Sequence, residues 1–242
     1  MKQSTFFILA LCILFSVSSC RFGMGKRVRG NGVSATQERQ VGSFTGVSGM
    51  GSMDIIVSKG PANTLKIEAD ENLLEFIETS NHNGTIEVHT REGYNLDPRS
   101  DIKVYATAPD FDYLNVSGSG KIKSNGKITS TNKLHTEVSG SGDIALDVDA
   151  PRVEAEIAGS GSVSMNGNTK DFAAHVSGSG DVRCFNLMAE NTELDVAGSG
   201  NAEVFASKTL DVDIAGSGDV RYKGNPSVKQ NTAGSGSVRK VD

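Results

Sequence analysis

The triplet Gly-Ser-Gly recurs seven times in the second half of the chain, and this repeat constrains the fold more than any other feature. The spacings between successive triplets are 22, 19, 19, 20, 18 and 18 residues. A unit of about twenty residues cannot bury a core of its own, so successive units must stack on one another. The repeat therefore predicts a solenoid.

The residues around each triplet indicate β-strands. In most repeats an aliphatic residue such as Val138 stands two positions before the first glycine, and another such as Ile144 stands two positions after the second. Alternation with a period of two is typical of strands with one buried face. We expect both glycines to point inward, where no side chain fits. These structural glycines are Gly118, Gly120, Gly140, Gly142, Gly159, Gly161, Gly178, Gly180, Gly198, Gly200, Gly216, Gly218, Gly234 and Gly236.

The serines of the triplets fall on the opposite, outward parity and form one column. Stacked parallel strands rise about 4.8 Å per rung, so six intervals give a rod roughly 29 Å long. We expect the serine hydroxyls to bond from rung to rung. No histidine keeps a fixed offset from them, as acyl-transfer chemistry would need, so the column is not a set of nucleophiles.

Residues 41–242 read as a single β-solenoid domain, with regular rungs over 113–242 and a larger-looped N-terminal β cap over 41–112. Short strands are expected around residues 54–57, 65–69, 85–89 and 102–106, and residues 70–77 form either a short helix or an irregular segment. No separate cap follows the last triplet. We therefore expect a homo-oligomer or another partner to cover the C-terminal rung.

Residues 1–19 have the order of a secretory signal peptide: Lys2, ten apolar residues over Phe6–Phe15, then small residues. Ten residues span roughly 15 Å as a helix, too short to cross a bilayer. Val17-Ser18-Ser19-Cys20 resembles the bacterial lipobox, which predicts lipidation of Cys20. The alternative is an ordinary cleaved signal with a chance cysteine. Residues 20–40 then form a lipidated basic tether, either a solvated linker or a contact for anionic headgroups.

This N-terminus predicts a lipoprotein of the cell envelope, anchored in the outer membrane and facing the periplasm or the surface. The basic residues that follow Cys20 favour the periplasmic side. After removal of the signal, the only cysteine besides Cys20 is Cys184, so no intrachain disulfide is expected. Cys184 has inward parity and is expected to be a buried small hydrophobe.

The charge of the chain argues against nucleic acid as a partner. The formal net charge is −5, and the first thirty residues contain five basic and no acidic side chains, which leaves −10 for residues 31–242. A body of this charge repels polyanions.

Acidic side chains are predicted to stack along the outer surface. One outward column reads Asn115, Glu137, Glu156, His175, Asp195, Asp213 and Asn231; a neighbouring one contains Glu154, Glu193 and Asp211; a third set is Asp143, Asp181 and Asp219. Stacked like charges repel. Three explanations are open: solvation, pairing with a basic column of Lys123, Arg183, Arg221 and Arg239, or binding of Ca²⁺, with Glu137, Glu156, Asp195, Asp213, Asp143, Asp181 and Asp219 as weak candidate ligands. No other cofactor is expected, and the four histidines lack metal spacing.

The repeats with the form Val-Ser-Gly-Ser-Gly-Asp-Val, the segment Asn72-Leu73-Leu74 and the closing segment 218–226 resemble the "putative auto-transporter adhesin, head-GIN domain" family of bacterial, often Bacteroidetes, proteins. This resemblance covers roughly residues 43–239. It implies a right-handed parallel β-helix and carries no catalytic residues.

Three functions follow as hypotheses. The first is a membrane-anchored, non-enzymatic binding or adhesion module with a protein or polysaccharide ligand. The second is a polysaccharide lyase or hydrolase on a β-helix scaffold; the short rungs, four Tyr and absence of Trp argue against it. The third is a structural envelope protein that assembles through its C-terminal rung.

Overall fold

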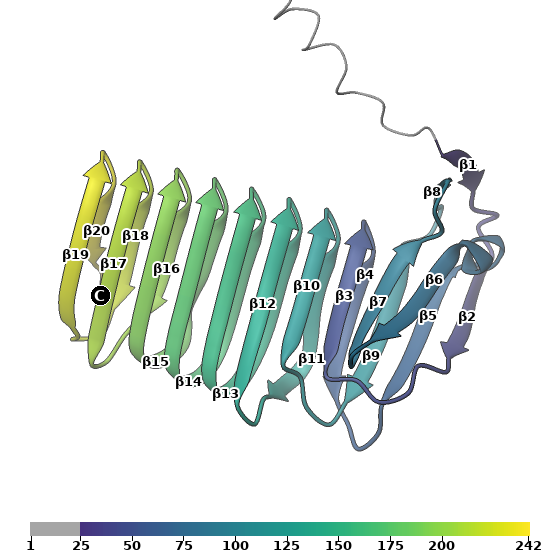
Figure 1. The fold of residues 1–242 in the computed structure, drawn as a ribbon, viewed down its shortest axis with the longest axis horizontal. Helices are drawn as coiled ribbons and strands as arrows, with labels where there is room; N and C mark the ends of the chain where they lie inside the picture. Colours follow the sequence, from purple (N-terminus) through teal and green to yellow (C-terminus); the bar gives the residue numbers. More distant parts are fainter. Residues whose placement is uncertain (1–24) are drawn as a thin grey trace, which may run out of the picture.

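A computed structural model describes residues 25–242 of the chain. The fold is 72% strand and 3% helix, and the strands form a β-solenoid of about six turns. In Figure 1 the strands ascend in front and descend behind while the coil advances from β3 toward β19, which is right-handed winding. The all-β solenoid predicted from the repeat is confirmed.

Two runs of paired strands face each other across the core, and in the regular rungs the strands of one run point opposite to those of the other (Figure 1). Sheet 1 contains β6 (Ile77–His82), β7 (Thr85–Thr90), β3 (Gly46–Gly51), β10 (Tyr113–Gly118), β12 (Lys133–Gly140), the second halves of β13 (Asp143–Gly159), β14 (Ser162–Gly178) and β15 (Asp181–Gly198), then β17 (Thr209–Gly216) and β19 (Ser227–Gly234). Sheet 2 contains β2 (Ser34–Arg39), β5 (Thr64–Asp70), β9 (Lys103–Ala108), β4 (Asp54–Lys59), β11 (Lys121–Thr129), the first halves of β13, β14 and β15, then β16 (Asn201–Phe205), β18 (Asp219–Lys223) and β20 (Ser237–Lys240).

Each Gly-Ser-Gly triplet forms the corner where the chain leaves sheet 1 and enters sheet 2. The first glycines have φ between +118° at Gly140 and +144° at Gly216, a region that residues with a Cβ rarely adopt. They also touch the preceding rung: a Cβ on Gly118 would lie 2.6 Å from the carbonyl oxygen of Gly51. The second glycines, such as Gly142 and Gly161, are buried in every triplet except the last, where Gly236 is partly exposed. The inward placement predicted for both glycines is therefore right only for the second.

The serines between these glycines hold the rungs together through their backbone and not through their hydroxyls. The N–H of Ser160 donates to the carbonyl of Gly140 at 2.8 Å, and the N–H of Ser179 donates to Gly159 at 2.8 Å. Among residues 25–242 none of the seven triplet hydroxyls has a protein hydrogen-bond partner. The predicted hydroxyl ladder is wrong because the turn directs each serine side chain outward, away from the next rung.

The core consists of stacked columns of aliphatic side chains between the two sheets. Val138, Ile157 and Val176 lie in register and are at most 2% exposed. Full burial of such a side chain contributes roughly 1.5–3 kcal/mol. Thr192 replaces an aliphatic residue in a neighbouring column, and its hydroxyl donates to the carbonyl of Phe205 at 3.0 Å, so no buried polar group is left unpaired there.

At the N-terminal end the same two sheets continue with antiparallel strands. β6 pairs antiparallel with β7 in sheet 1, and β2 and β9 pair antiparallel with β5 in sheet 2. A short 3₁₀ helix, η1 (Glu71–Phe76), buries Leu73 and Leu74 against this end. Residues 70–77 are thus mostly this helix, one of the two predicted alternatives.

The second half of the predicted tether belongs to the folded domain, which corrects the tether assigned to residues 20–40. β1 (Lys26–Arg29) pairs in parallel with β8 (Tyr94–Asp97), and β2 pairs with β5 through the register Ala35↔Ala69. β2 covers what would otherwise be the open edge of β5. Its sequence, Ser-Ala-Thr-Gln-Glu-Arg, carries one apolar residue, and for that reason it resembles a linker.

The last rung differs from the others in its inward side chains. Gln230 and Thr232 stand in register with the buried Val212 and Ile214 of β17. Every residue of β19 is exposed. Polar side chains at these positions lower the apolar area that this end presents to water.

Candidate functional site

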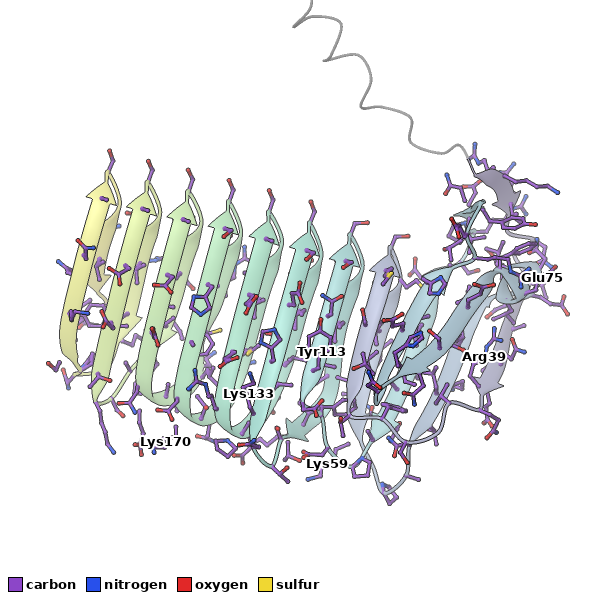
Figure 2. The ribbon with its side chains drawn as sticks, in the orientation of Figure 1. Arg39, Lys59, Glu75, Tyr113, Lys133 and Lys170 are labelled. Atoms are coloured by element: carbon purple, nitrogen blue, oxygen red, sulfur yellow. The ribbon has the colours of Figure 1, made fainter. Side chains whose placement is uncertain are left out.

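The outward face of sheet 1 carries the acidic columns in the predicted register. Asn115, Glu137, Glu156, His175, Asp195, Asp213 and Asn231 form one ladder, which Ser48 of β3 extends toward the cap. The neighbouring ladder is Tyr113, His135, Glu154, Ala173, Glu193, Asp211 and Lys229. Figure 2 shows Tyr113 and Lys133 on this face.

Some of the acidic side chains on this face have hydrogen-bond or ion-pair partners on the same face. Nζ of Lys133 and Nε of Arg152 each lie 2.8 Å from a carboxylate oxygen of Glu154. Nδ1 of His175 lies 2.8 Å from Oδ2 of Asp195. The hydrogen bond from Lys133, helped by that from Arg152, outweighs burial and lowers the pKa of Glu154 to about 2.

An aromatic pair marks the cap end of the same face. The rings of Tyr113 and His135 stack with centroids 5.7 Å apart, and the Tyr113 hydroxyl donates to Oε2 of Glu137 at 2.9 Å. Burial and this hydrogen bond raise the pKa of Tyr113 to about 12. The side chain of His135 is only 19% exposed, because the Tyr113 ring and neighbouring side chains cover it.

On sheet 2 the predicted basic column is interrupted and lies on the opposite side of the molecule from the acidic columns. Lys123, Ala145, Ser164, Arg183, Glu203, Arg221 and Arg239 stand in register. Arg183 pairs with Asp181 of its own strand, and Arg221 pairs with Glu203 of the rung before. Pairing of this column with the acidic columns of sheet 1 is therefore excluded, because the core separates them.

The third acidic set alternates with uncharged donors. Asp143, Ser162, Asp181, Asn201, Asp219 and Ser237 occupy successive rungs of sheet 2. Ser162 donates to Asp143 at 2.7 Å, and a hydrogen bond from Ser237 lowers the pKa of Asp219. Two rungs, about 9.6 Å, separate successive carboxylates, which weakens their repulsion.

Metal binding finds little support in this geometry. Within the described part of the chain, no three His, Cys, Asp or Glu side chains are grouped so that they could hold a metal ion. The candidate ligands instead divide between two faces: Glu137, Glu156, Asp195 and Asp213 lie on sheet 1, and Asp143, Asp181 and Asp219 on sheet 2.

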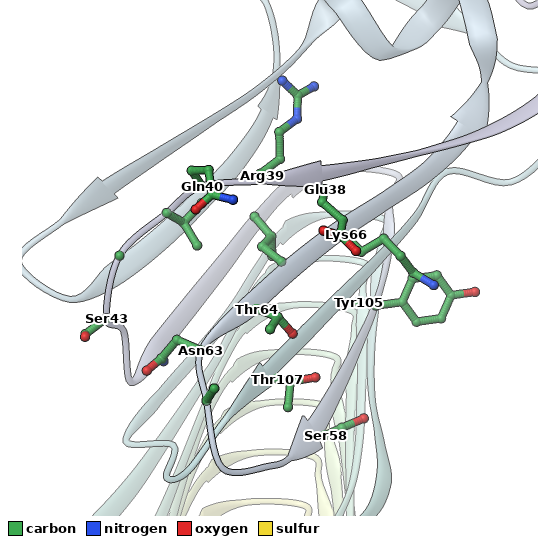
Figure 3. Close-up of a pocket in the computed structure, with 14 residues that line it drawn as sticks. Glu38, Arg39, Gln40, Ser43, Ser58, Asn63, Thr64, Lys66, Tyr105 and Thr107 are labelled. Atoms are coloured by element: carbon green, nitrogen blue, oxygen red, sulfur yellow. The ribbon is translucent and has the colours of Figure 1, made fainter.

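A cavity formed by strands and loops of the cap is the best-defined one near uncharged polar groups, and we call it the cap pocket. Its volume is about 730 Å³, and it lies between the segment 38–43, which leaves β2, and strands β4, β5 and β9 (Figure 3). Thr64, Thr107 and Ser58 form one row across its floor, because the three strands are paired at these positions. Asn63 donates to the carbonyl of Phe44 at 2.6 Å and fixes the loop on the far side.

The lining of the cap pocket is mostly polar and uncharged. Gln40, Ser43, Ser58, Thr64 and Thr107 contribute amide and hydroxyl groups. Glu38 and Lys66 lie at its edge, and the Lys66 ammonium lies 4.7 Å from the centre of the Tyr105 ring. In Figure 3 the guanidinium of Arg39 points away from the threonine row; it donates to the carbonyls of Leu74 and Ile77. The sequence did not reveal this pocket, because its residues come from four strands outside the repeat.

Of Cys184 and Cys20, only Cys184 lies in the described part of the chain. Cys184 is buried, and burial raises its pKa to about 12, so it is a core residue as expected. Cys20, the predicted lipidation site, lies outside the described residues. Within the described part of the chain no helix is long and apolar enough to span a membrane.

Comparison with known proteins identifies the family. The family model described as "Putative auto-transporter adhesin, head GIN domain" matches residues 43–226. The chain belongs to this family. The family description is one of adhesins and not of enzymes. Among proteins with curated descriptions, none matches the chain.

Solved structures of Bacteroidetes proteins share the fold. A "putative lipid binding protein" from Parabacteroides distasonis is 27% identical with a TM-score of 0.74, and the match covers 90% of this chain and 100% of that one. A "putative adhesin" from Bacteroides fragilis is 19% identical with a TM-score of 0.82, covering 88% of this chain and 100% of that one. These two structures thus share both the array and the cap with this chain.

Proposed function

We propose that this protein is a lipid-anchored, non-enzymatic binding module of the bacterial cell envelope, and that its cap pocket binds a hydroxyl-rich ligand such as an oligosaccharide. The observation that carries this proposal is the row of Ser58, Thr64 and Thr107 on the floor of the cap pocket. Within residues 25–242 these hydroxyls have no side-chain hydrogen bond to protein, so they are free to bind a ligand.

The polar lining favours an oligosaccharide over an acyl chain. A cavity for a lipid tail is lined mainly by apolar side chains, whereas the exposed lining here is largely hydroxyl, amide and charged groups. The name of the Parabacteroides relative refers to lipid binding, and a lipid headgroup rich in hydroxyls would fit the same donors and acceptors. The adhesin description of the family agrees with a binding role.

The anchor supports an envelope location. The lipobox-like Val17-Ser18-Ser19-Cys20 follows an apolar segment of signal-peptide length. Acylation of Cys20 would hold the domain on the outer membrane, facing the periplasm or the surface. Replacement of Cys20 by Ala is expected to abolish palmitate incorporation and to release the protein from the membrane fraction; unchanged labelling would contradict the anchor.

The binding proposal is tested with purified protein on an array of bacterial glycans, followed by calorimetry on the best ligand. The double variant Thr64→Val, Thr107→Val keeps the β-branched shape but removes two hydroxyls. Each lost hydrogen bond to a neutral group is worth about 0.5–1.5 kcal/mol, so we expect affinity to fall on the order of tenfold.

The matched control is Ser177→Ala, Ser179→Ala on the array, which removes two exposed hydroxyls far from the pocket. It should bind as the wild type does. Equal binding by the pocket variant would contradict the site. Release of shortened or unsaturated sugars during the assay would instead establish the polysaccharide lyase or hydrolase alternative.

A further inference from the structure

β1 and β8 form a small parallel sheet that is separate from the main solenoid. Four residue pairs join them, from Lys26↔Tyr94 to Arg29↔Asp97. An isolated two-stranded sheet is marginally stable in water. This ribbon adds little to the core, since only Leu96 packs against it. Its position at the cap end of the molecule is visible in Figure 1.

Polar contacts with the cap fix the ribbon in place. The side chain of Asn72 accepts from the N–H of Asn31 at 2.8 Å and donates to the carbonyl of Arg29 at 2.9 Å. Asp70, which is fully buried, accepts from the N–H of Arg99 at 2.7 Å. The ring of Tyr94 packs against Phe76 at 4.7 Å. The ribbon is therefore held rigidly on the cap.

The ribbon presents basic side chains to solvent. Arg27 and Arg29 are 73% and 72% exposed, and Asp97 is the one acidic residue within ion-pair distance of either. Lys26 and Arg99 are also exposed and have no acidic partner in the described part of the chain. Val33, 55% exposed, follows on the adjoining loop. Residues 25–33 and 94–99 together carry four basic side chains and one acidic side chain, Asp97, a net charge of +3, whereas residues 31–242 carry −10; Glu71, Glu92 and Asp101 flank these segments.

The ribbon also begins only six residues after Cys20. A fully extended chain spans at most about 3.6 Å per residue, so Lys26 lies within roughly 22 Å of the proposed acylated cysteine. In Figure 1 the last rungs lie at the opposite end of the long axis. This basic surface is thus close to the proposed anchor.

We propose that the β1–β8 ribbon docks on the anionic phospholipid headgroups of the membrane through Lys26, Arg27, Arg29 and Arg99. This inference rests on the proposed anchoring at Cys20. It adds the orientation of the folded domain relative to the membrane. The acidic body is repelled by the same surface, so the cap lies next to the membrane and the C-terminal rungs lie away from it.

The test measures binding of residues 20–242 carrying Cys20→Ala to vesicles of phosphatidylglycerol with phosphatidylcholine, and to vesicles of phosphatidylcholine alone. This chain contains every described element and no acyl group, so the result does not depend on acylation, which the palmitate experiment reports separately. We expect binding only to the anionic vesicles, with loss near 1 M salt, where the screening length is about 3 Å.

The variant Arg27→Gln, Arg29→Gln, Arg99→Gln is expected to lower the partition coefficient at least about tenfold, since each basic residue near an anionic surface contributes roughly fivefold. The matched control, Lys170→Gln, Lys229→Gln, Arg239→Gln, removes the same charge from the far half and should bind like the wild type. Circular dichroism checks that both remain folded. Equal losses in the two variants, or no preference for anionic vesicles, would overturn the proposal.

Discussion

The regular rungs and the cap belong to the same two sheets but differ in how their strands pair. In the array every strand pairs in parallel with its equivalent in the next rung, so each residue lies beside the residues at the same position of the neighbouring rungs. In the cap β3 and β4 still pair in parallel with β10 and β11, but beyond them the sheets end in antiparallel pairs with a short helix between them. A repeated motif is sufficient to specify the stacked rungs. The end of the solenoid is instead closed by segments whose sequences do not repeat.

The glycines show this difference most directly. Gly159 and Gly84 both have positive φ, +130° and +85°. A Cβ on Gly159 would overlap the carbonyl oxygen of Gly140, whereas a Cβ on Gly84 would meet no atom within 4 Å. The array needs glycine for conformation and for space, and the cap turn needs it for conformation alone.

The largest predicted effect is therefore that of Gly159→Ala. Strain and overlap with the rung before should lower the free energy of unfolding by about 3 kcal/mol or more, while Gly84→Ala, with strain alone, should lower it by about 1 kcal/mol. Chemical denaturation of both variants measures the difference. Equal losses would show that close stacking at the corner is not what selects glycine.

The second prediction concerns acid stability. The pKa of Glu154 is about 4.5 in the unfolded chain and about 2 in the folded protein, so its stabilisation is present above pH 4.5 and is lost as pH falls toward 2. Allowing for solvent screening, Glu154→Gln should remove about 1–2 kcal/mol at pH 7 and nothing near pH 2.

The control for this prediction is Glu156→Gln in the adjacent column, whose side chain is 51% exposed and has no strong partner. It should leave the pH dependence of unfolding nearly unchanged. If both variants flatten the pH profile equally, the general charge of the face and not the Lys133–Glu154–Arg152 contact is responsible.

The smallest predicted changes in stability compare a cap side chain that makes several hydrogen bonds with an array side chain that makes none among the described residues. Asn81 donates to the carbonyls of Val41 and Ser43 and accepts from the N–H of Gly84, so Asn81→Ala should cost about 1–2 kcal/mol. Ser179 bonds through its backbone, and Ser179→Ala should change stability by less than about 0.5 kcal/mol. A larger loss of stability for Ser179→Ala, measured by thermal unfolding, would support the hypothesis that the serine hydroxyls bond from rung to rung.

The array could be predicted from the sequence because period and parity together fix its register. The column from Asn115 to Asn231 was predicted residue by residue, since each member stands at one offset from its triplet. The direction of the turn at the first glycine could not be predicted. The alternation of apolar and polar residues continues through the triplet and does not show that the chain reverses direction there. Only the positive φ distinguishes the two glycines, and both have the same sequence signal.

The cap and its pocket were predicted only in part. Strands β4, β5, β7 and β9 alternate clearly, but β2 and β8 carry few apolar residues and are specified by the edges that they cover. Thr107 lies far in the sequence from Ser58 and Thr64, and the three residues meet only because β5, β9 and β4 pair in mixed directions. No local pattern encodes that meeting.

The central claim is that consecutive coils lie in register, one strand spacing apart. Spin labels on Ser119→Cys and Ser235→Cys test it by distance measurement, with Cys20→Ala present and the buried Cys184 left unlabelled. Six intervals predict about 29 Å between the two backbone positions, and the pair Ser160→Cys and Ser235→Cys, four intervals apart, predicts about 19 Å. Separations that do not shorten by about 10 Å between the two pairs would contradict the stacked register.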